Sequence, residues 1–272
     1  MRPRLVTALD GFFQVNFFDW LVPGAAVMFA AAMLVTFLVF VRRAGDAGLA
    51  RYHAAGMGLW AMVGGLVGSR VFYLLQHWQA TLADPSQLWS TKGEATSWGA
   101  YLGGFTGLVL YARLKGMELW PYADVIGSCL GLGPAIGRWG CFLNGDDFGS
   151  VSRLPWAVRF PHASIPFVFQ ARAGVVDPLA DLSLPVHPSQ IYLSLNGLAL
   201  FFIFTRYWNR ARSQPGATFW LYTLAYCVTR FLWEFLRGDQ VQHVFGVTVP
   251  QAVSLVLVPM AFVAWRRSHH AR

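Results

Sequence analysis

The chain has 272 residues, of which 56% are hydrophobic and only 12% are charged. An average soluble domain carries about 25% charged residues, so these charges are too few to cover the surface of a soluble chain of this length. The composition argues against a soluble enzyme, a disordered chain and a secreted disulfide scaffold. It predicts an integral membrane protein.

The net charge of +8 comes from 21 basic and 13 acidic residues. The basic residues form short clusters between apolar runs, such as Arg42-Arg43 and Arg266-Arg267. Clusters of this kind are typical of charge-directed membrane topology, so we expect no nucleic-acid partner. The three cysteines are scattered without CxxC spacing, which favours neither a disulfide framework nor a zinc site. We expect no metal and no cofactor.

Seven apolar runs approach the length of about 20 residues that a membrane-spanning helix needs. They cover residues 20–41, 54–76, 97–112, 121–137, 188–205, 217–236 and 246–265. We therefore predict an all-α membrane protein with about seven transmembrane helices in a single polytopic domain, residues 1–272.

The distribution of Lys and Arg predicts the orientation of these helices. One side receives eleven basic residues: Arg42, Arg43, Arg51, Arg113, Lys115, Arg206, Arg210, Arg212, Arg266, Arg267 and Arg272. The short segments on the other side hold four: Arg2, Arg4, Lys92 and Arg237. We expect the N-terminus outside, the C-terminus in the cytoplasm, and residues 138–187 as an outward-facing, periplasmic insertion between spans four and five.

Glycines recur at helical spacing inside several of these runs, for example Gly64 with Gly68 and Gly103 with Gly107. Small residues let membrane helices approach closely. We interpret these glycines as helix-packing positions.

Ionisable residues inside membrane spans are costly, so they are candidates for function. The predicted topology places Arg70, Arg138 and Arg237 near the outer ends of their spans, together with residues 101–104 and 187–190. Three arginines without matching acids indicate an anionic ligand, and a phospholipid phosphate is the anion available at that depth.

Structural explanations exist for some of these residues. Arg230 and Glu234 are spaced i,i+4 and can neutralise one another. Arg70 can extend toward the membrane interface. Arg237 has Glu234 and Asp239 nearby in sequence, so a structural ion-pair network is also open.

Four ordered motifs resemble those of the bacterial prolipoprotein diacylglyceryl transferases. They are Gly-Ser-Arg-Val-Phe-Tyr at 68–73, Gly-Arg-Trp-Gly-Cys-Phe-Leu-Asn-Gly-Asp at 137–146, His-Pro-Ser-Gln-Ile-Tyr at 187–192 and Trp-Glu-Phe-Leu-Arg-Gly-Asp at 233–239. The run Pro250–Ser254 and Pro259 also resemble the last span of that family. The likeness covers most of the chain.

The resemblance implies an enzyme of lipoprotein maturation in the bacterial plasma (inner) membrane, with its active site near the outer leaflet. Such transferases move the diacylglyceryl group of phosphatidylglycerol to the lipobox cysteine of a prolipoprotein signal peptide. The product is a thioether, and glycerol-1-phosphate leaves. The implied partners are phosphatidylglycerol, the prolipoprotein and membrane lipids.

The resemblance also implies site residues. Catalytic roles fall on Arg138, Arg237, His187 and Asp146. Substrate-binding roles fall on Arg70, Tyr73, Asn144, Gly145, Ser189, Gln190, Glu234, Gly103 and Gly104.

The sequence departs from the family where protons are handled. Leu102 stands where family members carry a histidine before the Gly-Gly pair, and Cys141 replaces an asparagine. Asp146 and Leu193 each replace a glutamate. The attacking thiol must still lose its proton, since the thiolate is the nucleophile. His187, Asp146 and water are the candidate acceptors.

Other functions are less well supported. A non-catalytic lipid- or lipoprotein-binding relative would keep the same arginines, and a transferase could use another lipid or thiol acceptor. A retinal protein needs a lysine within a span, whereas Lys92 and Lys115 lie in predicted loops. A transporter would show related halves and polar groups at the midplane.

Overall fold

The computed structural model describes residues 24–84, 97–239, 243–244 and 246–270. The chain divides into two units, Met1–Thr36 with Asp124–Arg272, and Phe37–Ala123. We call them the first and the second unit. Helices α2 (Gly24–Asp46) and α6 (Trp120–Cys129) each contribute to both units.

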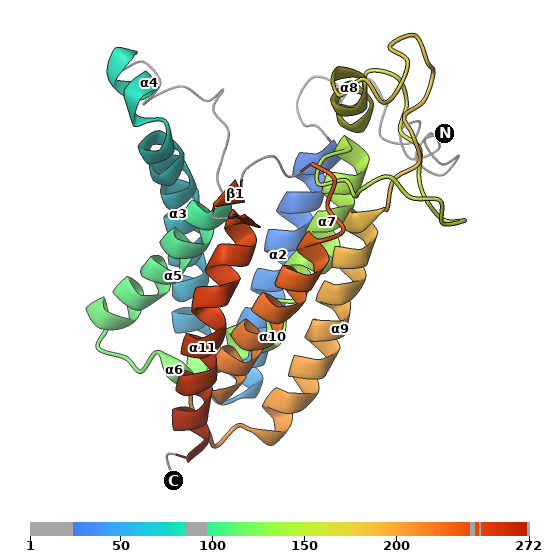
Figure 1. The fold of residues 1–272 in the computed structure, drawn as a ribbon. Helices are drawn as coiled ribbons and strands as arrows, with labels where there is room; N and C mark the ends of the chain where they lie inside the picture. Colours follow the sequence, from blue (N-terminus) through green and yellow to red (C-terminus); the bar gives the residue numbers. More distant parts are fainter. Residues whose placement is uncertain (1–23, 85–96, 240–242, 245, 271–272) are drawn as a thin grey trace. The chain divides into compact units, whose positions relative to one another are not determined.

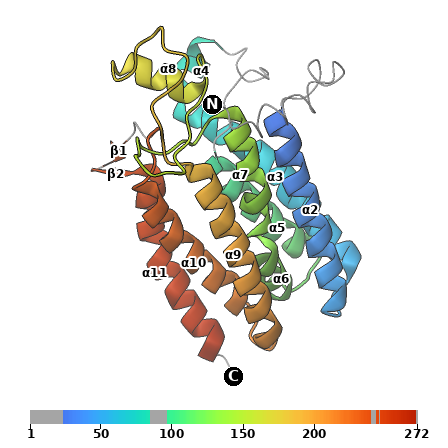
Figure 2. The same ribbon diagram turned by 90° about the vertical axis from the view of Figure 1, so that its right-hand side faces the viewer.

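The first unit is a set of packed helices with one long irregular connection. Its helices are α7 (Leu132–Asn144), α8 (Ile165–Arg172), α9 (Ser189–Arg210), α10 (Ala217–Glu234) and α11 (Val249–His270). The first part of α2 and the last part of α6 also belong to it. Helix α7 packs on α9, α9 on α10, and α10 on α11 (Figures 1 and 2). The strand pair β1 (His243–Val244) and β2 (Val247–Thr248) precedes α11.

The second unit is built on close contact between α3 (Arg51–Gln76) and α5 (Ser97–Leu114), with the short α4 (Trp78–Ala83) after α3. Glycines make this contact possible. A Cβ atom added at Gly103 would overlap the backbone carbonyl of Gly64, and one added at Gly68 would overlap that of Gly99. The predicted role of these glycines in helix packing is confirmed.

The described part of every predicted apolar run is mostly helical. Residues 20–23, at the start of the first run, lie outside the described residues. Among the described residues, three helical segments are long and apolar enough to cross a membrane: Gly24–Asp46, Arg51–Leu75 and Val249–Ser268. The fold is thus mostly helical, with three candidate membrane-spanning helices.

The prediction of one continuous helix over 121–137 is wrong. The chain turns at Leu130 and Gly131, between α6 and α7. A Cβ atom added at Gly131 would overlap the carbonyl of Gly197 on α9, so the backbones of the two segments meet directly at this turn.

Residues 138–144, which were predicted to belong to the insertion 138–187, continue α7 instead. The outward-facing position of the insertion remains a prediction. The irregular connection from Gly145 to Pro188 contains α8 and several isolated strand-like bridges. Its residues Phe148, Phe160 and Val186 form a small core with Phe142 of α7.

A buried carboxylate fixes the start of α10. Asp124 of α6 accepts hydrogen bonds from the backbone N–H groups of Gly216 (2.7 Å) and Phe219 (2.9 Å). The first N–H groups of a helix have no partner within the helix, so Asp124 takes the place of an N-capping residue from a distant part of the chain.

Candidate active site

The site begins at the carboxyl end of α7. This helix carries Arg138 and Cys141 and ends at Asn144, because Gly145 adopts a left-handed conformation (φ 81°) that suits glycine. The backbone N–H of Gly145 donates to the carbonyl of Cys141 at 2.8 Å. Asp147 is also left-handed (φ 55°), a conformation that Asp tolerates better than most residues. The chain therefore turns sharply and brings Asp146 and Asp147 back toward α7.

The Asp147 carboxylate bridges two arginines. One of its oxygens accepts from Arg138 on α7 and the other from Arg237, which follows α10. Arg237 also forms a bidentate pair with Asp239, from Nε at 2.9 Å and from Nη2 at 2.6 Å. The expectation that these arginines lack matching acids is wrong for Arg138 and Arg237.

The arginine pair sets the ionisation of Asp147. Burial alone would raise the pKa of this carboxyl, but the positive charges of Arg138 and Arg237 outweigh burial and lower it below its usual range. For Arg237, burial favours the neutral form, while the bonds and charges of Asp239 and Asp147 raise the pKa of the guanidinium group. Asp147 and Arg237 are therefore both charged at neutral pH.

Asp146 has a different environment from its neighbour. Its Oδ2 accepts from Nδ2 of Asn144 at 3.2 Å, and its buried Oδ1 has no hydrogen-bond partner among the described residues. Burial raises the pKa of Asp146, only partly offset by the bond from Asn144. Two adjacent carboxyl groups thus have pKa values moved in opposite directions, a pattern common in acid–base sites.

The start of α9 holds the Asp146–Asp147 turn in place. The hydroxyl of Ser189 donates to the carbonyl of Asp147 at 2.5 Å, and Nε2 of Gln190 donates to the carbonyl of Asp146 at 2.6 Å. Both side chains are buried. The predicted substrate-binding residues Ser189 and Gln190 therefore position the two carboxylates.

A short extended segment, residues 148–151, joins His187 to Arg237. On one side Gly149 and Ser150 exchange backbone hydrogen bonds with His187, and on the other Ser150 donates to the carbonyl of Leu236. A Cβ atom at Gly149 would overlap Cβ of His187, so only glycine fits this position. Two strand spacings of about 4.8 Å put the backbones of His187 and Arg237 about 10 Å apart.

The ring of His187 is bonded to a tyrosine. Nδ1 of His187 lies 3.4 Å from the hydroxyl oxygen of Tyr192, and that oxygen accepts from Nε1 of Trp156 at 2.7 Å. The Tyr192 ring also packs on Trp233, with ring centroids 5.6 Å apart. The His187 ring is thus linked through Tyr192 of α9 to Trp156, another residue of the same irregular connection.

Glu234 is paired with Arg230, as the i,i+4 spacing indicated. The Glu234 side chain has no exposed surface, and its Oε1 has no hydrogen-bond partner within the described part of the chain. The predicted substrate-binding role of Glu234 remains a prediction, whereas its neutralising contact with Arg230 is confirmed.

The remaining predicted residues lie in the second unit. The Arg70 guanidinium group lies over the Tyr73 ring at 5.4 Å. Gly103 and Gly104 face the backbone of α3, where a Cβ atom would contact the carbonyls of Gly64 and Ala61. Leu102, where the family pattern has a histidine, is 60% exposed. Ligand contacts for these residues remain predictions.

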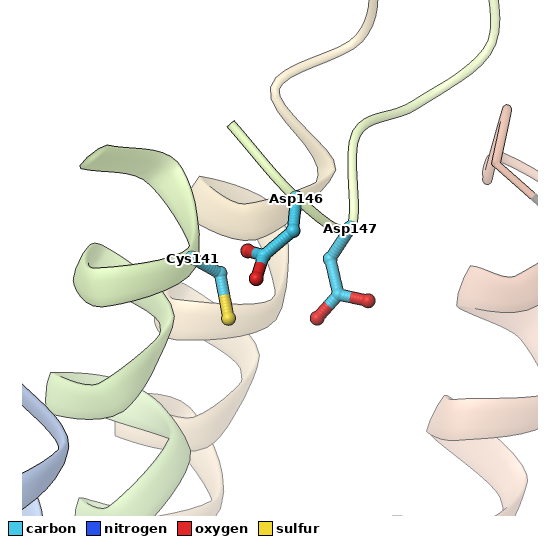
Figure 3. Close-up of side chains that lie close together, drawn as sticks. All are labelled: Cys141, Asp146 and Asp147. Atoms are coloured by element: carbon cyan, nitrogen blue, oxygen red, sulfur yellow. The ribbon is translucent and has the colours of Figure 1, made fainter. Parts of the chain in front are cut away.

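One cluster has the donor types of a metal site. The Cys141 sulfur and the carboxylates of Asp146 and Asp147 lie within 4.8 Å of one another and point toward a common space (Figure 3). Both oxygens of Asp147 already accept from arginines, so this carboxylate is better explained as an arginine partner than as a metal ligand. The expectation of no metal site remains a prediction.

The sequence interpretation missed Asp147, Tyr192 and Trp156. Asp147 was overlooked because the family pattern assigns the acid to position 146. An acidic residue two positions after the glycine that ends an arginine-bearing helix was the available signal. No local signal could pair Trp156 with Tyr192, because 36 residues separate them.

The fold and the site together define a mostly helical protein with candidate membrane spans and a partly buried arginine pair at a helix end. The family model for prolipoprotein diacylglyceryl transferase matches residues 18–267. The chain belongs to this family of transferases.

Curated relatives named phosphatidylglycerol–prolipoprotein diacylglyceryl transferase are similar over most of their length. The protein from Clostridium tetani is 27% identical over 235 residues, 86% of this chain and 88% of that protein. The one from Gloeobacter violaceus is 34% identical over 224 residues, 79% and 77% of the two chains. The one from Thermotoga maritima is 30% identical over 236 residues, 85% and 76%.

Proposed function

We propose that this chain transfers the diacylglyceryl group of phosphatidylglycerol to the lipobox cysteine of prolipoproteins, the first step of lipoprotein maturation. Family membership supports the reaction. The observation that ties it to particular residues is the Asp147 carboxylate held between Arg138 and Arg237. An anion bridging two guanidinium groups is the arrangement that a phosphodiester needs.

The phosphate of phosphatidylglycerol binds this arginine pair in place of the Asp147 carboxylate. Arg237 keeps its bidentate pair with Asp239, through Nε and Nη2, when the Asp147 carboxylate leaves. The arginines act most strongly in the transition state, because the phosphate gains negative charge as it leaves.

The chemical step exchanges one bond for another. The cysteine thiol loses its proton, and its sulfur attacks the carbon of the diacylglyceryl group that bears the phosphate. A C–S bond forms and the bond between that carbon and the phosphate oxygen breaks. Glycerol-1-phosphate leaves with the electron pair and accepts a proton. Asp146 and His187 are the side chains of the site that can accept the proton from the thiol.

The proposal includes a location. Seven spans with the N-terminus outside place the turn after α7 and residues 145–187 on the outer face of the bacterial plasma membrane. The surplus of basic residues on the opposite side supports this orientation. In the first unit, Asn144, Gly145 and Glu234 then contribute to binding the lipid or the signal peptide. In the second unit, the candidate binding residues are Arg70, Tyr73, Gly103 and Gly104.

Two experiments test the function. A strain depleted of its own transferase should grow when it expresses this chain, and the purified protein should attach a diacylglyceryl group to a lipobox peptide in vesicles containing phosphatidylglycerol. An active relative serves as the positive control. Binding of phosphatidylglycerol without thioether formation, beside that active control, would contradict the proposal and indicate a lipid-binding relative.

A Leu102→His variant tested in parallel restores the histidine of the family pattern. If proton removal limits the rate, this variant should raise the rate of transfer. If the protein already has an efficient proton acceptor, the variant should leave the rate unchanged.

A further inference from the structure

The hydrogen bonds around Tyr192 carry information about the protonation of His187. A tryptophan N–H can only donate, so the Tyr192 oxygen must accept from Trp156. The hydroxyl then has its single proton left to donate. Among the described residues, the one other side-chain polar atom within hydrogen-bond distance of this oxygen is Nδ1 of His187, at 3.4 Å.

The two possible arrangements differ in how well they satisfy the tyrosine. If Tyr192 donates to Nδ1, its hydroxyl group both accepts and donates within the protein. If Nδ1 carries the proton instead, the hydroxyl proton has no acceptor among the described residues. The first arrangement makes one more hydrogen bond within the protein and fixes the direction of both bonds of the hydroxyl group, so it is favoured.

The rest of the local structure leaves the His187 ring little freedom. The backbone N–H of His187 donates to Ser150, and its carbonyl accepts from Gly149 and Ser189. Its Cβ lies against Gly149. The Tyr192 ring is in turn held by Trp233. Tyr192 can therefore impose one ring orientation and one tautomer on His187.

We propose that Trp156 and Tyr192 are positioning residues that hold His187 as the neutral tautomer with its proton on Nε2. In this form Nδ1 is engaged by Tyr192, and Nε2 can donate a hydrogen bond but cannot accept a proton. His187 then donates to a phosphate oxygen of the substrate and is not the base for the thiol.

This inference rests on the proposed function for its chemistry and assigns the proton acceptor. Asp146 is the remaining side-chain candidate, and its buried Oδ1 has no partner in the described structure. Its carboxylate would take the thiol proton and pass it to the departing glycerol-1-phosphate, so that no net proton stays on the enzyme. Arg138, Cys141, Asn144 and Asp147 are the charged and polar groups around it.

The tautomer can be measured without any assay of activity. Protein labelled with 15N-histidine in phosphatidylglycerol nanodiscs should show a non-protonated Nδ1 and a protonated Nε2 for His187 at neutral pH, with His187→Asn identifying the signals. Tyr192→Phe should convert this pattern to a mixture of tautomers. A protonated Nδ1 in the unmodified protein would overturn the inference even if the enzyme is active.

Amide substitutions test the role of the ring in catalysis. Glutamine places an amide donor near the position of Nε2, whereas asparagine places its amide near Nδ1. A hydrogen bond to a charged oxygen is worth about 10- to 100-fold in rate. We expect His187→Asn to lose about that much transfer activity and His187→Gln to lose far less, with an unchanged pH profile. Equal losses in both variants, with loss of the acidic limb, would show that His187 is the base.

The positioning residues have their own control. Trp156→Phe keeps the aromatic ring but removes the donor to Tyr192, so the tautomer signal should broaden or shift and kcat should fall several-fold with little change in KM. Phe169→Leu, in α8 of the same connection, should change neither. An unaltered tautomer in both Trp156→Phe and Tyr192→Phe would overturn the assignment of these two residues.

Discussion

Two aspartates of the first unit, Asp124 and Asp147, each hold two hydrogen-bond donors, but the donors are of different kinds. Asp124 is held by backbone N–H groups at the start of α10, and Asp147 by the guanidinium groups of Arg138 and Arg237. Backbone amides are fixed by the helix and cannot be given to another ligand without disturbing it. Guanidinium groups on side chains can release one anion and accept another. The first carboxylate therefore stabilises the fold, and the second occupies a site that a phosphate can enter.

The largest effect should follow from removing an arginine. Arg138→Ala and Arg237→Ala should each lower the rate of diacylglyceryl transfer by about 100-fold or more, as loss of a transition-state donor does. Lysine should not restore the rate, because it cannot make the planar two-point contact. Transfer to a lipobox peptide measures this, and Arg266→Ala, exposed on α11, is the matched control.

The next effect should appear in stability. Asp124→Ala leaves two backbone N–H groups of α10 without their acceptor, so we expect a loss of about 2 kcal/mol in the free energy of unfolding. Asp124→Asn, which keeps one oxygen acceptor, should lose about half as much. Thermal unfolding in detergent measures both. Activity per folded molecule should be unchanged. A loss of activity per folded molecule would show that Asp124 does not act on the fold alone and would remove its difference from Asp147.

A smaller effect, stabilisation by an added anion, should distinguish variants of Asp147 from variants of Asp124. Asp147→Asn leaves the arginine pair without its bridging charge, so this variant should be less stable than the unmodified protein and should recover about 1 kcal/mol when phosphate or phosphatidylglycerol is added. The unmodified protein should gain less from the same anion. Asp124→Asn should gain nothing beyond the unmodified protein. Equal gains in all three proteins would show that the anion acts elsewhere.

The smallest effect concerns pH. Because the folded protein raises the pKa of Asp146, its charged form is disfavoured, and stability falls as pH rises through the window between the unfolded and folded values. Asp146→Asn should therefore be more stable than the unmodified protein, by less than about 1 kcal/mol, at neutral pH but not below about pH 4. Asp147 has a lowered pKa, so its stabilising contribution should be lost only as pH falls below about 4.

The sequence predicted the helices well because hydropathy is a local property, and the apolar runs that became α2, α3 and α11 are nearly unbroken. It failed at Leu130 and Gly131, where contact with Gly197 of another helix decides the backbone. The site was predicted only in part, because some of its residues lie in local motifs while others depend on contacts between distant segments. Arg138, Arg237 and His187 stood out in motifs. The choice of Asp147 over Asp146 as the arginine partner depends on a turn that Ser189 and Gln190 hold through bonds spanning 42 and 44 residues.

The bond between Asp147 and Arg237 joins residues 90 positions apart in the chain. During synthesis, α7 and its turn are made long before α10 and Arg237 emerge from the ribosome. Contacts between such distant positions form late, since the intervening chain must first be ordered. A nascent chain that stops short of Arg237 would therefore hold the first arginine and its aspartate but no arginine pair, so the anion site should be among the last parts of the protein to mature.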